Sequence, residues 1–221
     1  MATIDLTHPV TPDMPVYPGM EPPVFAAQSS VAQDGYLEKK ITFYSHTGTH
    51  VDAPAHMIAD GKGLDRFDIS HFHGTAVTLS LPGPADLQKD MQIRTDMLTP
   101  HESRLLKADF LLIHTGWSRY WQTDTYFSGF PVLSPDAARW LTTLGLKGIG
   151  FDAISADRAD SHDFPVHHIL LGKEILIIEN LTGLDGLPPG PVGFSCFPMR
   201  FLDADGSPVR AVAFVPDSNE E

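Results

Sequence analysis

The chain has 221 residues, a formal net charge of -13 and a single cysteine, Cys196. This length fits one large domain, although length alone does not separate that from two small ones. The acidic balance and the lack of a Lys- or Arg-rich run argue against nucleic acid or an anionic membrane as the main partner. One cysteine excludes an intrachain disulfide and a thiolate cluster for structural zinc. With no visible signal peptide and no apolar stretch that could cross a bilayer, we expect a cytoplasmic protein without membrane contact.

The first half of the chain is predicted to be extended and then rich in strands. Prolines punctuate residues 2–25 and oppose a helix there. Leu37 to Tyr44 broadly alternates between apolar and polar residues, which predicts a strand that leads into a histidine-rich segment. Thr75 to Leu81 and Asp109 to His114 are also predicted strands, and the turn Pro82-Gly83-Pro84 closes the first of them.

The second half of the chain alternates a helix with further strands. Ser134 to Leu144 is predicted to be a helix, with Ser134 as N-cap, Pro135 at the first position and Gly145 at the end. Three strands are expected after it: Gly148 to Ile154, Ile175 to Glu179 and Val209 to Val215. The end of the chain, Pro216 to Glu221, is expected to fray. No repeat or linker divides the chain, so we predict a single α/β domain over residues 1–221 with a mixed β-sheet.

The motif S-H-T-G-T-H-V-D-A-P-A-H-M concentrates side chains that bind metals and carry protons. In an extended strand, His46, His50 and Asp52 would lie on one side. A straight strand would hold the two histidines roughly 13 Å apart, whereas both must lie about 2.1 Å from a shared ion. A bend is therefore needed, and Gly48 is where it is least costly. We predict a metal site on a curved, irregular segment, with His56 beside it as a proton carrier.

A further ligand is expected from the later part of the chain. Glu179 ends an apolar strand, and a carboxylate there must face solvent or be paired. His167 and His168 precede apolar residues, so one of the two points inward, and the pattern does not choose between them. His168, like His162, also fits a solvated loop position. Asp152 could orient a histidine or cap a turn. The remaining candidates are Asp157, Asp160, Asp163 and Glu174.

The histidine motif resembles the signature of the cyclase-like metal-dependent hydrolases, which include bacterial kynurenine formamidase and isatin hydrolase. The resemblance continues along almost the whole chain, through I-D-L-T, H-T-G-W, G-F-D, P-V-H-H-I-L-L, I-I-E-N-L and D-G-S-P-V-R. It implies a swivelling β/β/α-like fold and a homo-oligomer, either a dimer or a tetramer.

The resemblance also implies a set of site residues. His46, His50 and Asp52 would bind one divalent ion, and Asp52 would bridge to a second ion held by His167 and Glu179. One or two ions, Zn²⁺ or Mn²⁺, would be present in each subunit. The family's catalytic histidine aligns with His56 of this chain.

The implied activity is hydrolysis of a carbon–nitrogen bond in a non-peptide amide, such as an N-formylkynurenine- or isatin-type substrate. Hydroxide activated by the ions would attack the carbonyl, and His56 would relay a proton to the departing nitrogen. Two alternatives stay open: a lactonase, esterase or ring-closing cyclase on the same site, and a metal-stabilised binding protein without turnover. The aromatic residues that could line the substrate pocket, or belong to the core, are Tyr17, Phe43, Trp117 and Trp121.

Overall fold

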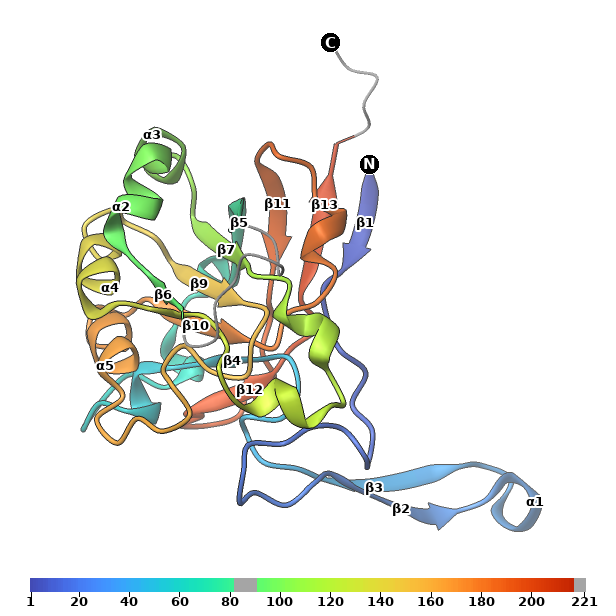
Figure 1. Ribbon diagram of the computed structural model, residues 1–221. Helices are drawn as coiled ribbons and strands as arrows, with labels where there is room; N and C mark the ends of the chain where they lie inside the picture. The colour runs from blue at the N-terminus through green and yellow to red at the C-terminus, as the bar shows by residue number, and fades with distance from the viewer. Residues whose placement is uncertain (82–90, 217–221) are drawn as a thin grey trace.

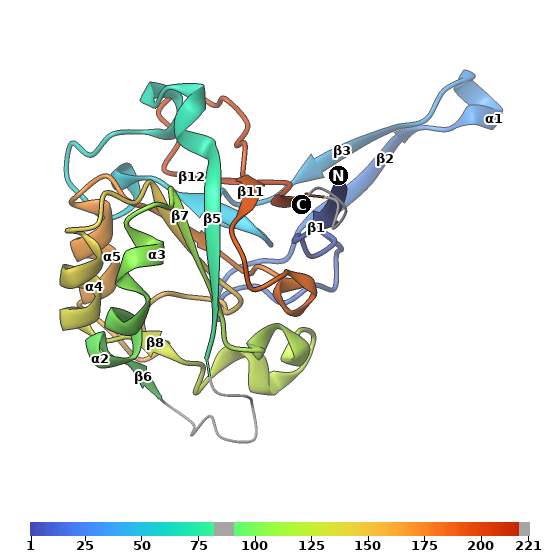
Figure 2. The same ribbon diagram turned by 90° about the horizontal axis from the view of Figure 1, so that it is seen from above.

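The computed structural model describes residues 1–81 and 91–216. Within them, nine strands form one mixed sheet, and α2 to α5 lie along one side of it (Figures 1 and 2). In sheet order, the strands are β1 (Ala2–Asp5), β13 (Val212–Val215), β11 (Val192–Ser195), β5 (His73–Ser80), β7 (Phe110–His114), β9 (Gly148–Phe151), β10 (Leu176–Glu179), β4 (His50–Asp52) and β12 (Gly206–Pro208).

The helices of the described residues are short, and none is long and apolar enough to span a membrane. The α-helices are α1 (Val31–Asp34), α2 (Thr95–Leu98), α3 (Glu102–Leu105), α4 (Pro135–Leu141) and α5 (Pro165–Leu171). The 3-10 helices are Pro54–His56, Leu64–Arg66, Ile69–Phe72, Thr99–His101, Trp117–Tyr120, Asp124–Phe127 and Leu184–Gly186. Two small sheets pair β2 (Val24–Ser29) with β3 (Glu38–Thr42) and β6 (Gln92–Ile93) with β8 (Val132–Leu133).

The centre of the large sheet is parallel and buried on both faces. Strands β5, β7, β9 and β10 run parallel to one another, and the strands on either side of them pair antiparallel. In β7, Leu111 and Ile113 pack in one core cluster, whereas Phe110 and Leu112 pack in another. A strand buried on both faces reads as a continuous apolar run, as β7 does. This architecture confirms the predicted α/β fold class with a mixed sheet.

The main predicted elements are present, most of them with shorter bounds. The predicted strands from residue 75 onward correspond to β5, β7, β9, β10 and β13. The predicted helix is α4, where the Ser134 hydroxyl accepts a hydrogen bond from the Ala137 amide at 3.2 Å. The turn Pro82-Gly83-Pro84 and residues 217–221 of the expected frayed end lie outside the described residues.

Two regions differ from the sequence-based expectation. The predicted strand over 37–44 is β3, but it pairs only with β2 in a hairpin that projects from the body of the molecule (Figures 1 and 2). Every residue of β3 is exposed, so its alternation marks no face packed on the core. Helix α5 was not predicted: unlike α4, it has no capping side chain before Pro165, and it follows Phe164, whose φ is +40°. Residues 2–25, expected to be extended, contain β1 and the start of β2.

Asp152 is a buried cap for the turn after β7. Its carboxylate accepts hydrogen bonds from the amides of Thr115, Gly116 and Trp117 and from the Thr115 hydroxyl. The sequence left two roles open for Asp152, orienting a histidine or capping a turn. These contacts show that it caps the turn.

Removing this cap should destabilise the protein. Asp152→Ala leaves buried amide donors without acceptors, and we expect a loss of about 3 kcal/mol in the free energy of unfolding, measured by chemical denaturation. Asp136→Ala is the control, because that carboxylate is exposed and should contribute less than about 0.5 kcal/mol. Equal losses for the two variants would contradict the capping role.

Candidate metal centre

Strand pairing places three of the predicted ligands on one face of the sheet. Strand β4 lies between β10 and β12, and His50 is directly opposite Glu179. Because alternate residues of a strand share a face, Asp52 lies on the same side as this pair. The His50 Nε2 atom is 3.2 Å from Asp52 Oδ1 and 3.5 Å from Glu179 Oε2. All three side chains are buried.

The predicted bend at Gly48 is present and brings the side chain of His46 next to Asp52. Gly48 has φ of +64°, a conformation that favours glycine, and a Cβ there would lie 3.3 Å from Val10 Cγ2. The His46 Nδ1 atom lies 2.7 Å from Asp52 Oδ1. Its Nε2 atom lies 3.1 Å from Asp205 Oδ2. The segment is therefore curved before residue 50, as predicted, and regular only in the three residues of β4.

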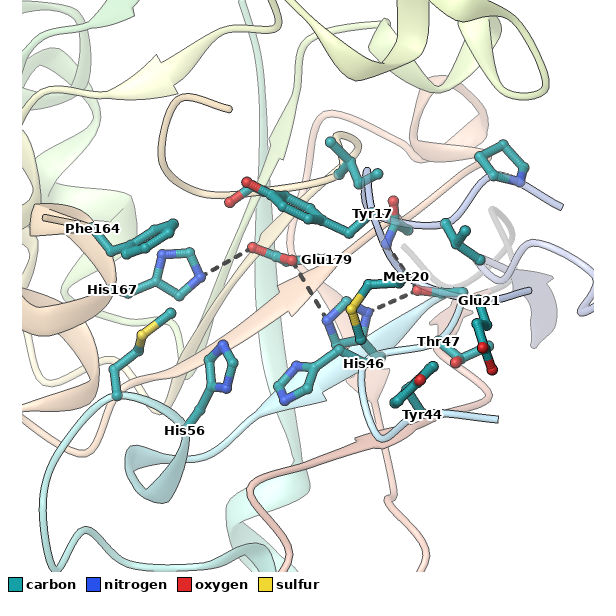
Figure 3. A pocket seen from close by; sticks show the side chains of 18 residues that line it. Tyr17, Met20, Glu21, Tyr44, His46, Thr47, His56, Phe164, His167 and Glu179 are labelled. Carbon is teal, nitrogen blue, oxygen red and sulfur yellow. Dashed lines mark hydrogen bonds and ion pairs between the residues drawn. The ribbon is translucent and has the colours of Figure 1, made fainter. Parts of the chain in front are cut away.

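Helix α5 presents His167, and not His168, to this site. The Asp157 carboxylate accepts hydrogen bonds from the Val166 and His167 amides and from His167 Nδ1, the last at 2.7 Å. This fixes the ring, so that Nε2 lies 3.3 Å from Glu179 Oε1 and 3.7 Å from an oxygen of Asp52 (Figure 3). His168 is exposed. Helix geometry thus makes the choice that the sequence pattern left open.

A buried hydrogen-bond chain holds His50 from behind. The Gly48 carbonyl oxygen accepts hydrogen bonds from His50 Nδ1 and from Asn180 Nδ2, both at 2.8 Å. The Asn180 Oδ1 atom accepts from the Tyr126 hydroxyl at 2.7 Å. Because Nδ1 of His50 is used in this way, its Nε2 atom is the one that faces Asp52 and Glu179.

The charges of the site suit a divalent cation. Burial acts to raise the pKa of Asp52, but His46 and His50 outweigh it and hold that pKa well below its usual value. Burial likewise acts to lower the pKa of His167, yet its hydrogen bonds with Asp157 and Glu179 raise it to about 10. Ligands must lose their protons to bind a metal, so an ion would replace protons that now balance the carboxylates.

One oxygen of the Asp52 carboxylate has no hydrogen-bond partner, and a bound ion would be its partner. Asp52 Oδ2 is buried and has no hydrogen-bond partner. The ligand atoms of His46, His50 and Asp52 all lie within 4.8 Å of one another, as do those of Asp52, His167 and Glu179. Histidine nitrogens and carboxylate oxygens are suitable ligands for a divalent transition metal. The residues therefore fit a metal centre, with Asp52 common to both groups.

A cavity of about 240 Å³ opens above these side chains (Figure 3). His56 lines it from the 3-10 helix that follows β4, with its ring centroid 3.9 Å from that of His46. Burial lowers the pKa of His56 to about 4, and the neighbouring histidines act in the same direction. Of the aromatic residues considered from the sequence, Tyr17 lines the cavity. Trp117 and Trp121 belong to a separate core cluster.

Some contributors to the site were not identified from the sequence. Asp205 contacts His46 because β12 pairs with β4, and no local spacing connects residues so far apart in the chain. Asp157 was only one of several candidates, and its role in orienting His167 depends on the start of α5. Asn180 follows Glu179 in the chain, and no pattern in the sequence indicates its hydrogen bond to Gly48. The other acidic and histidine candidates are exposed: Asp160, His162, Asp163 and Glu174.

Known proteins resemble this chain in sequence and in structure. Residues 4–158 match the model of the Cyclase family, described as "Putative cyclase". The kynurenine formamidase of Geobacillus thermodenitrificans (strain NG80-2) is 33% identical over 210 residues, which cover 94% of this chain and 95% of that protein. A crystal structure of an isatin hydrolase bound to the product analogue thioisatinate has a TM-score of 0.87 at 22% identity, covering 97% of this chain and 92% of that chain.

The likeness to the isatin hydrolase structure shows a common fold. A third protein, described as a potential metal-dependent hydrolase with cyclase activity, has a TM-score of 0.77 at 27% identity, with 96% of both chains covered. The family model spans more than half of the sequence, and the formamidase relative extends along nearly all of it. On these grounds, the chain belongs to the cyclase family.

Proposed function

We propose that this protein is a metal-dependent hydrolase that cleaves the carbon–nitrogen bond of a non-peptide amide, on a substrate of the N-formylkynurenine or isatin type. The observation that carries the proposal is Asp52, a buried carboxylate shared by two groups of candidate ligands. The other members of these groups, His46, His50, His167 and Glu179, line the floor of a largely apolar cavity. The relatives named kynurenine formamidase support the same reaction class.

The proposed ligand assignment follows the two groups that share Asp52; a third group, His46, His56 and Asp205, does not contain it. His46, His50 and Asp52 would hold one ion, and Asp52 with His167 and Glu179 would hold a second. One or two ions, Zn²⁺ or Mn²⁺, are compatible with ligands that offer nitrogen and oxygen but no sulfur. When bound, such ions polarise a substrate carbonyl and activate water as a nucleophile.

The chain's own residues would bind the substrate and move the proton. Val16, Ile154 and Phe164 form apolar walls that pack against an aromatic ring and exclude water. Water adds to the amide carbonyl carbon, and the bond from that carbon to nitrogen then breaks. His56 would accept the proton from the attacking water and return it to the departing nitrogen, so that a carboxylic acid and an amine are formed. Asp205 lies 3.9 Å from His56 Nδ1 and would favour its charged form during this transfer.

The alternatives are less well supported. A lactonase, esterase or ring-closing enzyme could use the same residues, but the curated relatives carry the name of an amide hydrolase. A binding protein that uses metal only for stability would close the metal site with ligands. Here an open cavity and an additional histidine, His56, lie beside the candidate ligands.

Loss of the shared carboxylate should remove the metal. We expect Asp52→Asn to bind metal at least tenfold more weakly, because the variant weakens both ligand groups; metal content after dialysis would be measured by mass spectrometry. Glu179→Gln should remove one ion where the wild type holds two. The control is Asp136→Asn on the surface of α4, which should keep the full content. Normal metal content in Asp52→Asn would contradict the bridging assignment.

Activity should depend on both the metal and His56. We expect the wild type to hydrolyse N-formylkynurenine or isatin, to lose activity with a chelator and to regain it with Zn²⁺ or Mn²⁺. His56→Ala should retain its metal while kcat falls about 10²–10⁴-fold, the usual contribution of a proton-transfer group. His168→Ala, an exposed neighbour of the site, is the control and should be fully active. Metal loss in His56→Ala would instead make His56 a ligand.

We also propose that residues 1–221 form one catalytic domain, and that the protein is a cytoplasmic homo-oligomer, either a dimer or a tetramer. A single buried cysteine suits a reducing compartment. The β2–β3 hairpin supports association, because it projects from the body and exposes Val31, Tyr36, Leu37 and Ile41. Apolar side chains gathered in this way mark contact surfaces.

Charged residues on the hairpin should separate the subunits. We expect Leu37→Glu combined with Ile41→Glu to convert the oligomer to monomers in light scattering after size exclusion, because the change buries charge at the interface. Lys40→Glu alters the charge of the same strand without removing an apolar side chain, and it should keep the oligomer. A monomeric wild type would contradict this proposal.

A further inference from the structure

The cavity above the candidate metal centre has an uneven distribution of charge. Its floor holds histidines and Glu179, and its walls are largely apolar or aromatic. Glu21 is the one further charged side chain among the described residues that line it, and neither Lys nor Arg is among them. Glu21 is exposed, whereas Glu179 is buried. The carboxylate of Glu21 therefore lies at the opening, away from the floor (Figure 3).

The backbone on both sides of Glu21 is restrained. A turn from Tyr17 to Met20 is closed by a hydrogen bond of 2.9 Å from the Met20 amide to the Tyr17 carbonyl oxygen. Within this turn, Gly19 has φ of +93°, which an L side chain rarely adopts. Pro22 and Pro23 follow Glu21 and fix their own φ angles. Within the described part of the chain, Glu21 makes no recorded hydrogen bond or ion pair, so its charge is available to a ligand.

The size of the cavity determines which part of a substrate meets Glu21. Its volume of about 240 Å³ is below the roughly 300–1,000 Å³ usual for ligand pockets. One aromatic ring with its amide fits inside it when the carbonyl reaches the floor. Substituents on the far side of the ring would then lie at the opening, beside Glu21 and Tyr44.

We propose that Glu21 is a specificity-determining residue that favours aryl amides with a cationic group, such as an ammonium, remote from the scissile bond, and disfavours those whose only remote charge is a carboxylate. The proposal rests on the amide-hydrolase function proposed above and specifies its substrate class. An ammonium at the opening would pair with Glu21, and a carboxylate would be repelled by it without a compensating cation in the lining.

Three formanilides that differ only in the charge of a meta substituent test this inference. They carry an aminomethyl group, which is cationic, a methyl group, which is neutral, or a carboxylate. We expect the wild-type kcat/KM to fall in that order. Glu21→Gln should lower kcat/KM for the aminomethyl compound about threefold to fivefold, the range of a partly exposed ion pair. It should raise the value for the carboxylate and change the methyl compound less than twofold.

Two controls separate a local charge effect from other causes. Asp13→Asn removes the same charge from an exposed position in the same segment that does not line the cavity, and it should leave all three values unchanged. Added salt should reduce the discrimination of the wild type, because it screens exposed charges. Loss of metal or stability in Glu21→Gln is checked by metal content and thermal unfolding.

The outcomes distinguish this inference from the proposed function. Turnover of all three compounds with relative kcat/KM values that Glu21→Gln does not change would overturn the role of Glu21 and leave the amide hydrolase intact. If the wild type hydrolyses none of them, the hydrolase proposal fails for aryl formamides. Calorimetric binding of the same compounds then tests Glu21 separately: tighter binding of the cation that is lost in Glu21→Gln supports the role, and equal binding contradicts it.

Discussion

A buried carboxylate needs positive charge beside it, and the whole site is organised around that requirement at Asp52. Asp52 is 1% exposed and is the last residue of β4, where strands on both sides fix its position. His46 and His50 contact one of its oxygens, and the second has no hydrogen-bond partner. Protonated histidines can balance the charge, and a bound metal ion would also give the second oxygen a partner. A metal centre follows from this arrangement more directly than from any single spacing in the sequence.

The sheet supplies the precision that the metal centre needs. Strand β4 is only three residues long, yet it is hydrogen-bonded on both sides, and its register places His50 opposite Glu179. Asp157 holds His167 through its ring and through the first amides of α5, so the helix and the ligand are positioned together. Candidate ligands supported by such contacts are held in one orientation, which strengthens metal binding. The hairpin and one wall of the cavity, by contrast, are formed by the less regular N-terminal part of the chain.

Local patterns in the sequence predicted part of this site, and tertiary structure determined the rest. The residues from His46 to His56 were recognised because their spacing and the glycine between them lie within one short motif. The choice of His167 over His168 depends on where α5 begins, and Asp157, ten residues before His167, accepts hydrogen bonds from the first amides of that helix. Asp205 could not be identified from spacing, because only the pairing of β12 with β4 brings it to His46. The full ligand assignment follows from the resemblance to a known family and not from local spacing.

The same distinction applies to the fold. Continuous apolar runs predicted the central strands correctly, because burial on both faces leaves a clear pattern in the sequence. The alternation in β3 predicted a strand, but a pattern of period two does not reveal whether the apolar side meets the core, solvent or another molecule. Exposed apolar residues on this hairpin are therefore a feature of the structure and not of the sequence pattern.

The most direct test of the account is a crystal structure of the metal-loaded protein, with anomalous diffraction recorded at the zinc and manganese absorption edges. The account predicts a peak at about 2.0–2.2 Å from Asp52 Oδ2 and from the ligand atoms of at least one of the two groups, with His56 free of the ion. An anomalous peak elsewhere, or none near Asp52 in a catalytically active protein, would contradict the central claim.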